Sequence, residues 1–424
     1  MSDVLVSGAD LLGRGRADLL LRDGRFADPA TAAADVERVD ADGLVALPGL
    51  VDLHTHLREP GREDAETHAT GTAAAARGGF TAVLAMANTL PVTDTAEAAE
   101  HVAALGERAG HTQVVPVGAV SKGLDGAELA ELGLMARSSA AVRVFSDDGH
   151  CVADARLMRR ALEYVRAFDG VIAQHAQDPR LAGPDACCHE GELSGRLGLP
   201  GWPAVAESSV VARDVQLAEL TRSRLHVCHV STAETVDVLR WAKLRGIDVT
   251  AEVAPHHLLL TTADVAGYDP TFKVNPPLRP DEHLGALRDA LADGTIDTVA
   301  TDHAPHARHD KEHAFAEAAS GMLGLETALG VVVETMLLPG RLNWGEVAER
   351  MSVVPARIAR LRGQGRPLAV GEPANLTLVD PAARAVVDRA ASASLSQNNP
   401  WHGRYLPDPV VATFWAGRPT YRRG

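Results

Sequence analysis

The stretch Leu50-Val51-Asp52-Leu53-His54-Thr55-His56 is the first of eight short apolar runs that decide the fold. Each run ends in polar residues and is followed by a segment rich in Ala, Leu, Arg and Glu, which favours a helix. The runs span residues 50–56, 81–89, 112–120, 141–149, 171–176, 224–231, 248–257 and 297–305. Eight alternating strands and helices over about 250 residues are typical of a (β/α)8 barrel. An open doubly wound sheet would instead carry a Gly-rich phosphate turn after its first strand, and 57–61 is not one.

The two ends of the chain have a different pattern from the barrel. Residues 1–49 alternate short apolar runs with turns such as Asp23-Gly24, which predicts small strands. The tail returns to this pattern at 374–380 and 410–413. We therefore expect an α/β protein with a TIM-like barrel at 50–361 and one small β-domain built from both termini, residues 1–49 and 362–424.

Composition excludes several classes of protein. The 424 residues carry 41 Lys+Arg against 56 Asp+Glu, a net charge of −15, and this acidic balance argues against nucleic-acid and membrane-surface binding. No apolar run approaches the ~20 residues that span a bilayer, and the first residues show no signal peptide. Four cysteines are too few for a disulfide framework. We expect a cytoplasmic protein with reduced thiols.

The chemistry is expected at the carboxyl ends of the strands, where barrel enzymes carry their catalytic residues. These ends are polar in five strands: His54-Thr55-His56, Ser146-Asp147-Asp148, His175, His226-Val227-Cys228-His229 and Thr301-Asp302-His303. A His-x-His pattern alone is expected roughly once by chance among 18 histidines, and it also fits a pair of hydrogen-bonded core histidines. The pattern indicates a metal site only in combination with the polar residues at the other strand ends.

Strand alternation predicts which of these side chains share one face, because residues two apart point the same way. On the first strand it places Leu50, Asp52, His54 and His56 inward. On the sixth it places Leu225, Val227 and His229 inward, with His226 and Cys228 outward. Four imidazoles and two carboxylates are then expected to converge at the mouth: His54, His56, His175, His229, Asp148 and Asp302. This composition is typical of a site that holds two zinc ions with a bridging hydroxide.

The run 48–61 resembles the signature of dihydroorotases, which are members of the amidohydrolase superfamily. Further matching segments occur in the family's order and span the whole barrel: 86–89, 145–149, 226–231, 255–258, 273–279 and 300–306. A small β-domain assembled from both chain ends is also what this resemblance implies.

Members of this superfamily differ in the residue that bridges the two metal ions. Hydantoinases, allantoinases and many dihydroorotases are expected to use a carboxylated lysine at the end of the fourth strand. None of the four lysines lies there, so the sequence resembles the dihydroorotases in which an aspartate takes this place. Alternation and the family pattern favour Asp148. The alternative is a bridge through Asp147, with Asp148 capping the next helix.

The resemblance implies the reversible closure of N-carbamoyl-L-aspartate to L-dihydroorotate in pyrimidine synthesis. Asp302 would be the catalytic proton shuttle as well as a metal ligand, although a role as ligand alone is the alternative. The substrate carboxylate would be bound by Arg58, Asn88 and Asn275, unless Arg58 merely pairs with Glu59 or Glu63 at the surface. The resemblance also implies that His56 and His306 contact the substrate. Gly321 is a further candidate for substrate binding. It lies near the end of the long loop 303–322, which is a candidate lid.

Two other functions are compatible with this pattern. One is another cyclic-amide hydrolase, of the hydantoinase or allantoinase type. The other is a non-catalytic, dihydroorotase-like subunit of an aspartate transcarbamoylase complex, which loss of metal ligands would indicate. A partnership with the transcarbamoylase is also open for an active enzyme, and we expect a homo-oligomer. Zinc, two ions per chain, is the expected cofactor, although cobalt or manganese would fit the same ligands.

Overall fold

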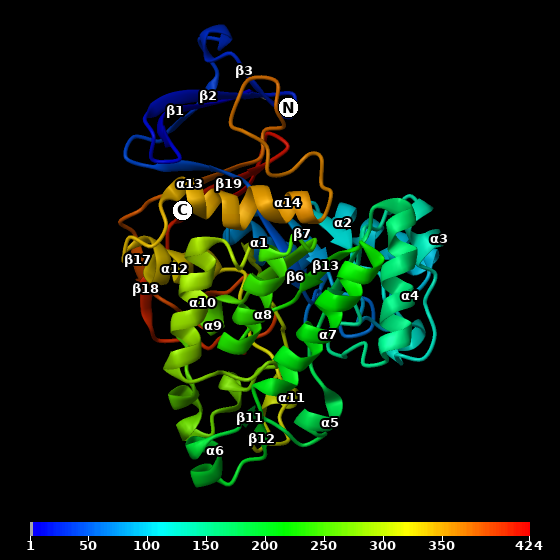
Figure 1. Ribbon diagram of the computed structural model, residues 1–424. Coiled ribbons are helices and arrows are strands. Elements are labelled where there is room, and N and C mark those ends of the chain that lie inside the picture. Colours follow the sequence, from blue (N-terminus) through cyan, green and yellow to red (C-terminus); the bar gives the residue numbers. More distant parts are fainter. Residues whose placement is uncertain (1–2) are drawn as a thin grey trace.

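The computed structural model describes residues 3–424 and has two parts. Figure 1 shows the sheet formed by the chain ends at the top and the barrel with its helices below it. Helices α13 (Trp344–Ala348) and α14 (Val354–Ile358) lie between the two parts. The residues predicted to form the active site all lie in the barrel part of the chain.

The barrel has eight strands, and each overlaps one of the predicted runs. They are β6 (Leu50–Thr55), β7 (Phe80–Ala85), β8 (Gln113–Pro116), β9 (Val144–Phe145), β10 (Val171–Gln174), β13 (Arg224–Val227), β14 (Val249–Val253) and β15 (Thr298–Val299). Neighbouring strands pair in parallel, in the groups β6-β7-β8 and β9-β10-β13-β14-β15. Parallel bridges between Gly118 and Phe145 and between Thr55 and His303 join the groups. The predicted closed barrel is therefore confirmed.

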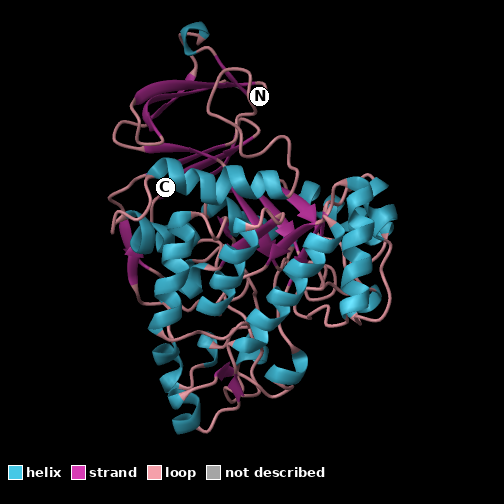
Figure 2. Ribbon diagram, in the orientation of Figure 1, coloured by secondary structure: helices cyan, strands magenta, loops and turns pink. Residues whose placement is uncertain are grey.

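Helices follow the strands around the outside of the barrel (Figure 2). They are α1 (His68–Arg77), α2 (Ala96–Ala109), α3 (Leu132–Arg137), α4 (Ala155–Val165), α7 (Val205–Thr221), α8 (Ala233–Leu244), α10 (Asp281–Asp293) and α12 (Ala328–Val332), while the short α11 (Arg308–Lys311) lies in the loop after β15. Local signals set their ends: α2 begins where Thr95 accepts the Ala98 N–H and ends at Gly110, which has φ 72°. Smaller elements extend the loops after β10 and β14: α5 (Pro179–Ala182), β11 (Cys188–His189), α6 (Glu192–Leu197), β12 (Gly201–Trp202) and α9 (Pro255–Leu259).

The barrel interior differs from simple alternation on two strands. Leu53 and Cys228 pack in a cluster with residues from the other strands, which places them inside the barrel. Leu50, Leu225 and Val227 instead pack in the layer beneath the helices, so the inward positions predicted for them are wrong. The pairing of β6 with β7 is irregular at two places, which shifts the alternation. On the sixth strand the side chains alternate with the opposite phase.

The small sheet is built from both ends of the chain, as predicted. Its strands are β1 (Val4–Leu11), β2 (Arg16–Arg22), β3 (Arg25–Ala27), β4 (Glu37–Asp40), β5 (Val45–Pro48), β16 (Leu376–Val379), β19 (Val410–Trp415) and β20 (Arg418–Arg422). The ends meet where β5 pairs antiparallel with β16, with Ala46 opposite Leu378. Within residues 3–424, strands β17 (Arg384–Val386) and β18 (Tyr405–Pro407) pair only with each other, and β18 packs against α12.

Two further features bear on the class of protein. Within residues 3–424, none of the helices combines the length and the apolar character that a bilayer crossing needs. The four cysteines, Cys151, Cys187, Cys188 and Cys228, are free thiols, as the sequence predicts.

Candidate metal centre and active site

The carboxylate of Asp148 lies in the middle of four imidazoles at the mouth of the barrel. Its Oδ1 is 3.2 Å from His54 Nε2, 3.2 Å from His175 Nδ1 and 3.3 Å from His229 Nε2. Its Oδ2 is 3.3 Å from His56 Nε2. All five side chains are buried. His229 reaches this cluster because its backbone turns to φ 29° just after β13, and not through the alternation that the sequence suggested.

Asp302 lies on one side of this cluster, just beyond the end of β15. Its Oδ1 is 3.2 Å from His56 Nε2 and 3.5 Å from His54 Nε2. Burial by itself would raise the pKa of Asp302, but the hydrogen bond with His56 and the charges of nearby imidazoles hold the pKa below its usual value. The side chain is therefore an anion at neutral pH and can accept a proton.

The donor atoms fit a pair of metal ions that share Asp148. Two groups of three donors, His54/His56/Asp148 and Asp148/His175/His229, each have all their donor atoms within 4.8 Å of one another. The buried His54 Nε2 has no hydrogen-bond partner within residues 3–424, although it faces two carboxylates. His175 Nδ1 and His229 Nε2 lie only 2.9 Å apart. Imidazole nitrogens and carboxylate oxygens in this arrangement suit zinc and similar ions.

The neighbouring Asp147 is turned away from the cluster. Its carboxylate accepts the backbone N–H groups of Val120 and Ser121 at 2.8 and 2.9 Å, and the Ser121 hydroxyl. Helix α4 is capped by Asp154, which leaves no capping role for Asp148. The lysines are engaged elsewhere, with Glu128, with Asp297 and with backbone carbonyls of the loop after β15. This geometry favours Asp148 over Asp147 as the shared ligand.

A buried carboxylate below the cluster was not among the predicted site residues. Glu252 on β14 accepts from His54 Nδ1 at 2.7 Å, and its other oxygen is 3.0 Å from His226 Nε2. His226 therefore points into the barrel, which corrects the outward position predicted for it. Burial opposes ionisation of Glu252, but the charge of His54 and the two imidazole hydrogen bonds lower its pKa to about 2. When His54 is neutral, this carboxylate holds its single proton on Nδ1, so the Nε2 lone pair faces the cluster.

This contact leads to a prediction for Glu252→Gln. The substitution keeps an oxygen acceptor for His54 but removes the negative charge of the Glu252 carboxylate. We therefore expect the metal affinity of the apoprotein to fall by about 10–100-fold. Competition with a chromophoric chelator measures it. Asp214→Asn is the matched control, because Asp214 is equally buried but bonds to Arg213 and Gln174. Equal affinities of Glu252→Gln and wild type would contradict this role.

Arg58 lies at the rim of the cluster rather than on the outer surface. Its Nε donates to the Pro305 carbonyl at 2.9 Å, and its Nη2 is 3.5 Å from His306 Nε2. Burial lowers the pKa of Arg58 to about 10, so the guanidinium stays charged. Glu59 accepts from His68 and Glu63 from the Gly61 N–H, so the surface ion pairs considered from the sequence are not formed.

Of the two asparagines predicted to bind substrate, one contacts an imidazole of the cluster directly and the other reaches one through Gln177. Asn88 Oδ1 is 2.9 Å from His56 Nδ1. Asn275 Nδ2 donates to Gln177 Oε1, which is also 3.0 Å from His175 Nε2. The buried Asn275 Oδ1 is without a partner in the described part of the chain. Gln177, two residues beyond His175, is a contact that the sequence did not indicate.

His306 and Gly321 lie together in the loop after β15. His306 Nε2 is 2.8 Å from the Ser320 carbonyl, and burial, with the charges of Arg58 and Lys311, lowers the pKa of His306 to about 2. The imidazole is therefore neutral. The Gly321 N–H donates to the Lys273 carbonyl at 2.9 Å, so it is not free for the substrate. A Cβ on Gly321 would lie 2.7 Å from that of Ala304, which requires glycine here.

Comparison with known proteins agrees with this geometry. A family model described as Dihydro-orotase-like matches residues 43–235. The dihydroorotase of Streptomyces coelicolor is 60% identical over 99% of this chain and 98% of its own length. This chain belongs to the dihydroorotase family. A second family member, the dihydroorotase of Mycobacterium tuberculosis, is 56% identical over 99% of both chains.

Solved structures place this dihydroorotase-family chain in the amidohydrolase fold. An L-hydantoinase from Arthrobacter aurescens matches with a TM-score of 0.87 and 25% identity, over 100% of this chain and 97% of that one. A dihydropyrimidinase from Brevibacillus agri matches with a TM-score of 0.85 and 21% identity, over 99% and 95% of the two chains. The (β/α)8 barrel and the family resemblance predicted from the sequence are thus confirmed.

Proposed function

We propose that this protein is an active dihydroorotase, which catalyses the reversible, zinc-dependent cyclisation of N-carbamoyl-L-aspartate to L-dihydroorotate in pyrimidine synthesis. The observation that carries this proposal is the position of Asp148 between two groups of imidazoles, with Arg58 at the rim. Its relatives over the full length are named dihydroorotase, which supports the choice among amidohydrolase reactions.

Two zinc ions per chain fit the donor set best. We assign His54, His56 and Asp302 to one ion and His175 and His229 to the other, with Asp148 shared between them. Bound zinc lowers the pKa of water towards neutrality and polarises the amide carbonyl.

Asp302 is the catalytic group in both directions. In ring opening, its carboxylate accepts a proton from the attacking water and then donates it to the departing ring nitrogen. In ring closure, the same carboxylate takes the proton from the ureido nitrogen as that nitrogen attacks the protonated side-chain carboxyl group, and passes it to the departing hydroxyl group, which leaves as water. The contact of Asp302 Oδ1 with His56 keeps this carboxylate anionic before the transfer.

The remaining residues would bind and orient the substrate. Arg58 is bonded through Nε to a backbone carbonyl, which leaves its Nη groups for the substrate carboxylate as a planar pair of donors. Asn88 and Asn275 would add neutral donors or acceptors, and His56 and neutral His306 would flank the ring. Gly321 would contribute a close-packed surface beside His306.

The substrate carboxylate gives a direct test of this function. Dihydrouracil has the same ring as dihydroorotate but lacks the carboxylate, so the wild-type enzyme should strongly prefer dihydroorotate. In Arg58→Met, kcat/KM for dihydroorotate should fall by about 10²-fold, while the value for dihydrouracil changes little. Arg159→Met is the control, because Arg159 is exposed and pairs with Glu163 on α4. Wild-type turnover of dihydrouracil but not of dihydroorotate would support a hydantoinase-like enzyme instead.

The alternative functions are less well supported by the same residues. A hydantoinase or allantoinase of the lysine-bridged type needs a lysine where Asp148 lies. A non-catalytic subunit would not need all six donors. We further propose a cytoplasmic homo-oligomer able to assemble with aspartate transcarbamoylase, with residues 50–361 as its catalytic unit and 1–49 and 362–424 as its β-domain.

A further inference from the structure

A single loop covers one side of the mouth of the barrel. Residues 304–321, here called the mouth loop, follow β15, include α11 and carry both His306 and Gly321. The loop begins and ends side by side, because the Ala304 N–H donates to the Met322 carbonyl at 2.9 Å. Its distal part is held by Lys273, whose Nζ donates to the carbonyls of Ala316 and Ala318.

One buried side chain from the C-terminal part of the chain joins the two ends of this loop. Asn398 Nδ2 donates to the Ala304 carbonyl at 2.9 Å and to the Gly321 carbonyl at 3.2 Å. Asn398 Oδ1 accepts the His306 N–H at 3.1 Å. The backbone carbonyl of the same residue accepts the Leu323 N–H at 3.1 Å. Residues 304–306 and 321–323, at the two ends of the mouth loop, are here called its neck. Both ends are thus bonded to Asn398.

We propose that Asn398 is a positioning residue for the substrate site. By closing the neck of the mouth loop it holds His306 and Gly321, and through the Pro305 carbonyl the Arg58 guanidinium, in the arrangement that receives the substrate carboxylate. This proposal rests on the proposed function. It assigns to the C-terminal part of the chain a role in a site whose other residues all come from the barrel.

The chemistry of the contacts explains why an amide is required at this position. The side chain must offer two N–H donors to two carbonyls and one acceptor to an N–H, which an asparagine amide supplies. An aspartate retains the acceptor for His306 but places a negative charge against the carbonyls of Ala304 and Gly321. An alanine loses all three bonds and leaves buried polar groups without partners, which is costly.

The segment that carries Asn398 is itself firmly attached to the barrel. Leu395 donates its N–H to Glu66 Oε1 at 3.0 Å, and the Ser394 hydroxyl bonds to the same carboxylate. The Ser396 hydroxyl donates to the Ala65 carbonyl at 2.6 Å. Asn398 is therefore carried by a segment that is itself bonded to the barrel.

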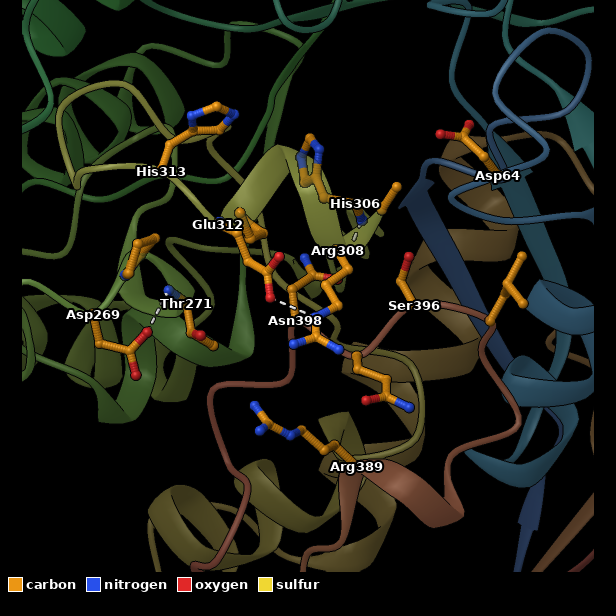
Figure 3. Close-up of a pocket in the computed structure, with 15 residues that line it drawn as sticks. Asp64, Asp269, Thr271, His306, Arg308, Glu312, His313, Arg389, Ser396 and Asn398 are labelled. Atoms are coloured by element: carbon orange, nitrogen blue, oxygen red, sulfur yellow. Dashed lines mark hydrogen bonds and ion pairs between the residues drawn. The ribbon is translucent and has the colours of Figure 1, made fainter.

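The other side of the neck faces open space. A cavity of about 770 Å³ is lined by His306, Ser396 and Asn398 together with charged residues of the mouth loop (Figure 3). Space on this side would allow His306 to move away from Arg58 if the bonds to Asn398 were lost. We therefore expect the loss of Asn398 to loosen the mouth loop locally without unfolding the barrel.

Hydrogen exchange and steady-state kinetics of the zinc-loaded enzyme test this role. In Asn398→Ala, amide exchange in 304–321 should become at least about 10-fold faster, and KM for dihydroorotate should rise by about 10-fold or more, because three hydrogen bonds are lost. We expect kcat to change by less than about 3-fold, with unchanged zinc content. Asn398→Asp should have the same effect on KM but protect the His306 amide better. Gln397→Ala, at an exposed neighbour, should match wild type.

The outcomes separate this proposal from the proposed function. If a folded Asn398→Ala or Asn398→Asp protein has wild-type exchange in 304–321 and wild-type KM, Asn398 does not position the loop. Should Asn398→Ala fail to fold, the aspartate variant decides the question. The exchange measurement needs no turnover, so it still tests the closure of the neck if the wild-type enzyme proves inactive on dihydroorotate. In that case the proposed function fails by itself.

Discussion

Replacing Asp302 by asparagine should lower kcat in both directions by about 10²–10⁴-fold, the usual contribution of a positioned acid–base group. Asparagine has nearly the same shape but cannot accept a proton from water or the ureido nitrogen. Initial rates with L-dihydroorotate and with N-carbamoyl-L-aspartate, measured with zinc analysis of the same samples, check this. The control is Asp297→Asn, at the other end of the same strand, where the carboxylate pairs with Lys243.

Metal content distinguishes the two roles considered for Asp302. If it is the proton shuttle, Asp302→Asn remains nearly inactive even when fully loaded with zinc. Recovery of wild-type kcat in excess zinc would mean that Asp302 acts only as a ligand. That result would contradict the mechanism but not the metal site.

Asp148→Asn should lose one metal ion and reduce activity by at least about 10²-fold. The carboxylate is shared by both groups of donors, so removal of its charge leaves four imidazoles without their common anionic neighbour. Metal analysis after gel filtration, together with initial rates, measures both effects.

The adjacent carboxylate provides a matched control. Asp147→Asn should keep both metal ions, while the loss of charge opposite the Ser121 and Val120 N–H groups lowers stability by about 1–3 kcal/mol. Two ions in Asp148→Asn and one in Asp147→Asn would reverse the assignment of the bridge.

The sequence predicted the barrel because its signals are local. Each strand carries its own apolar run and its own polar end, so the positions of His54, His175 and Asp302 at the mouth follow from the order of the runs. Alternation failed where the backbone is irregular. The bulged pairing of β6 and the turn at His229 depend on neighbouring strands, and a single-strand pattern does not contain them.

The supporting residues could not be predicted because their partners are distant in the chain. Glu252 is 198 residues from His54, and Asn398 is 94 residues from Ala304. Glu252 had one weak signal, a charged residue within the buried strand Val249–Val253. Asn398 lies in a polar segment whose composition is that of any exposed loop, so only the folded structure indicates its role.

Removal and return of zinc tests the central claim most directly. The protein is stripped with a chelator, zinc is added back in steps, and the interconversion of L-dihydroorotate and N-carbamoyl-L-aspartate is followed in both directions. We predict no turnover by the stripped protein and full recovery in both directions at two zinc ions per chain. Absence of turnover with two zinc ions bound, or unchanged turnover without metal, would contradict the account.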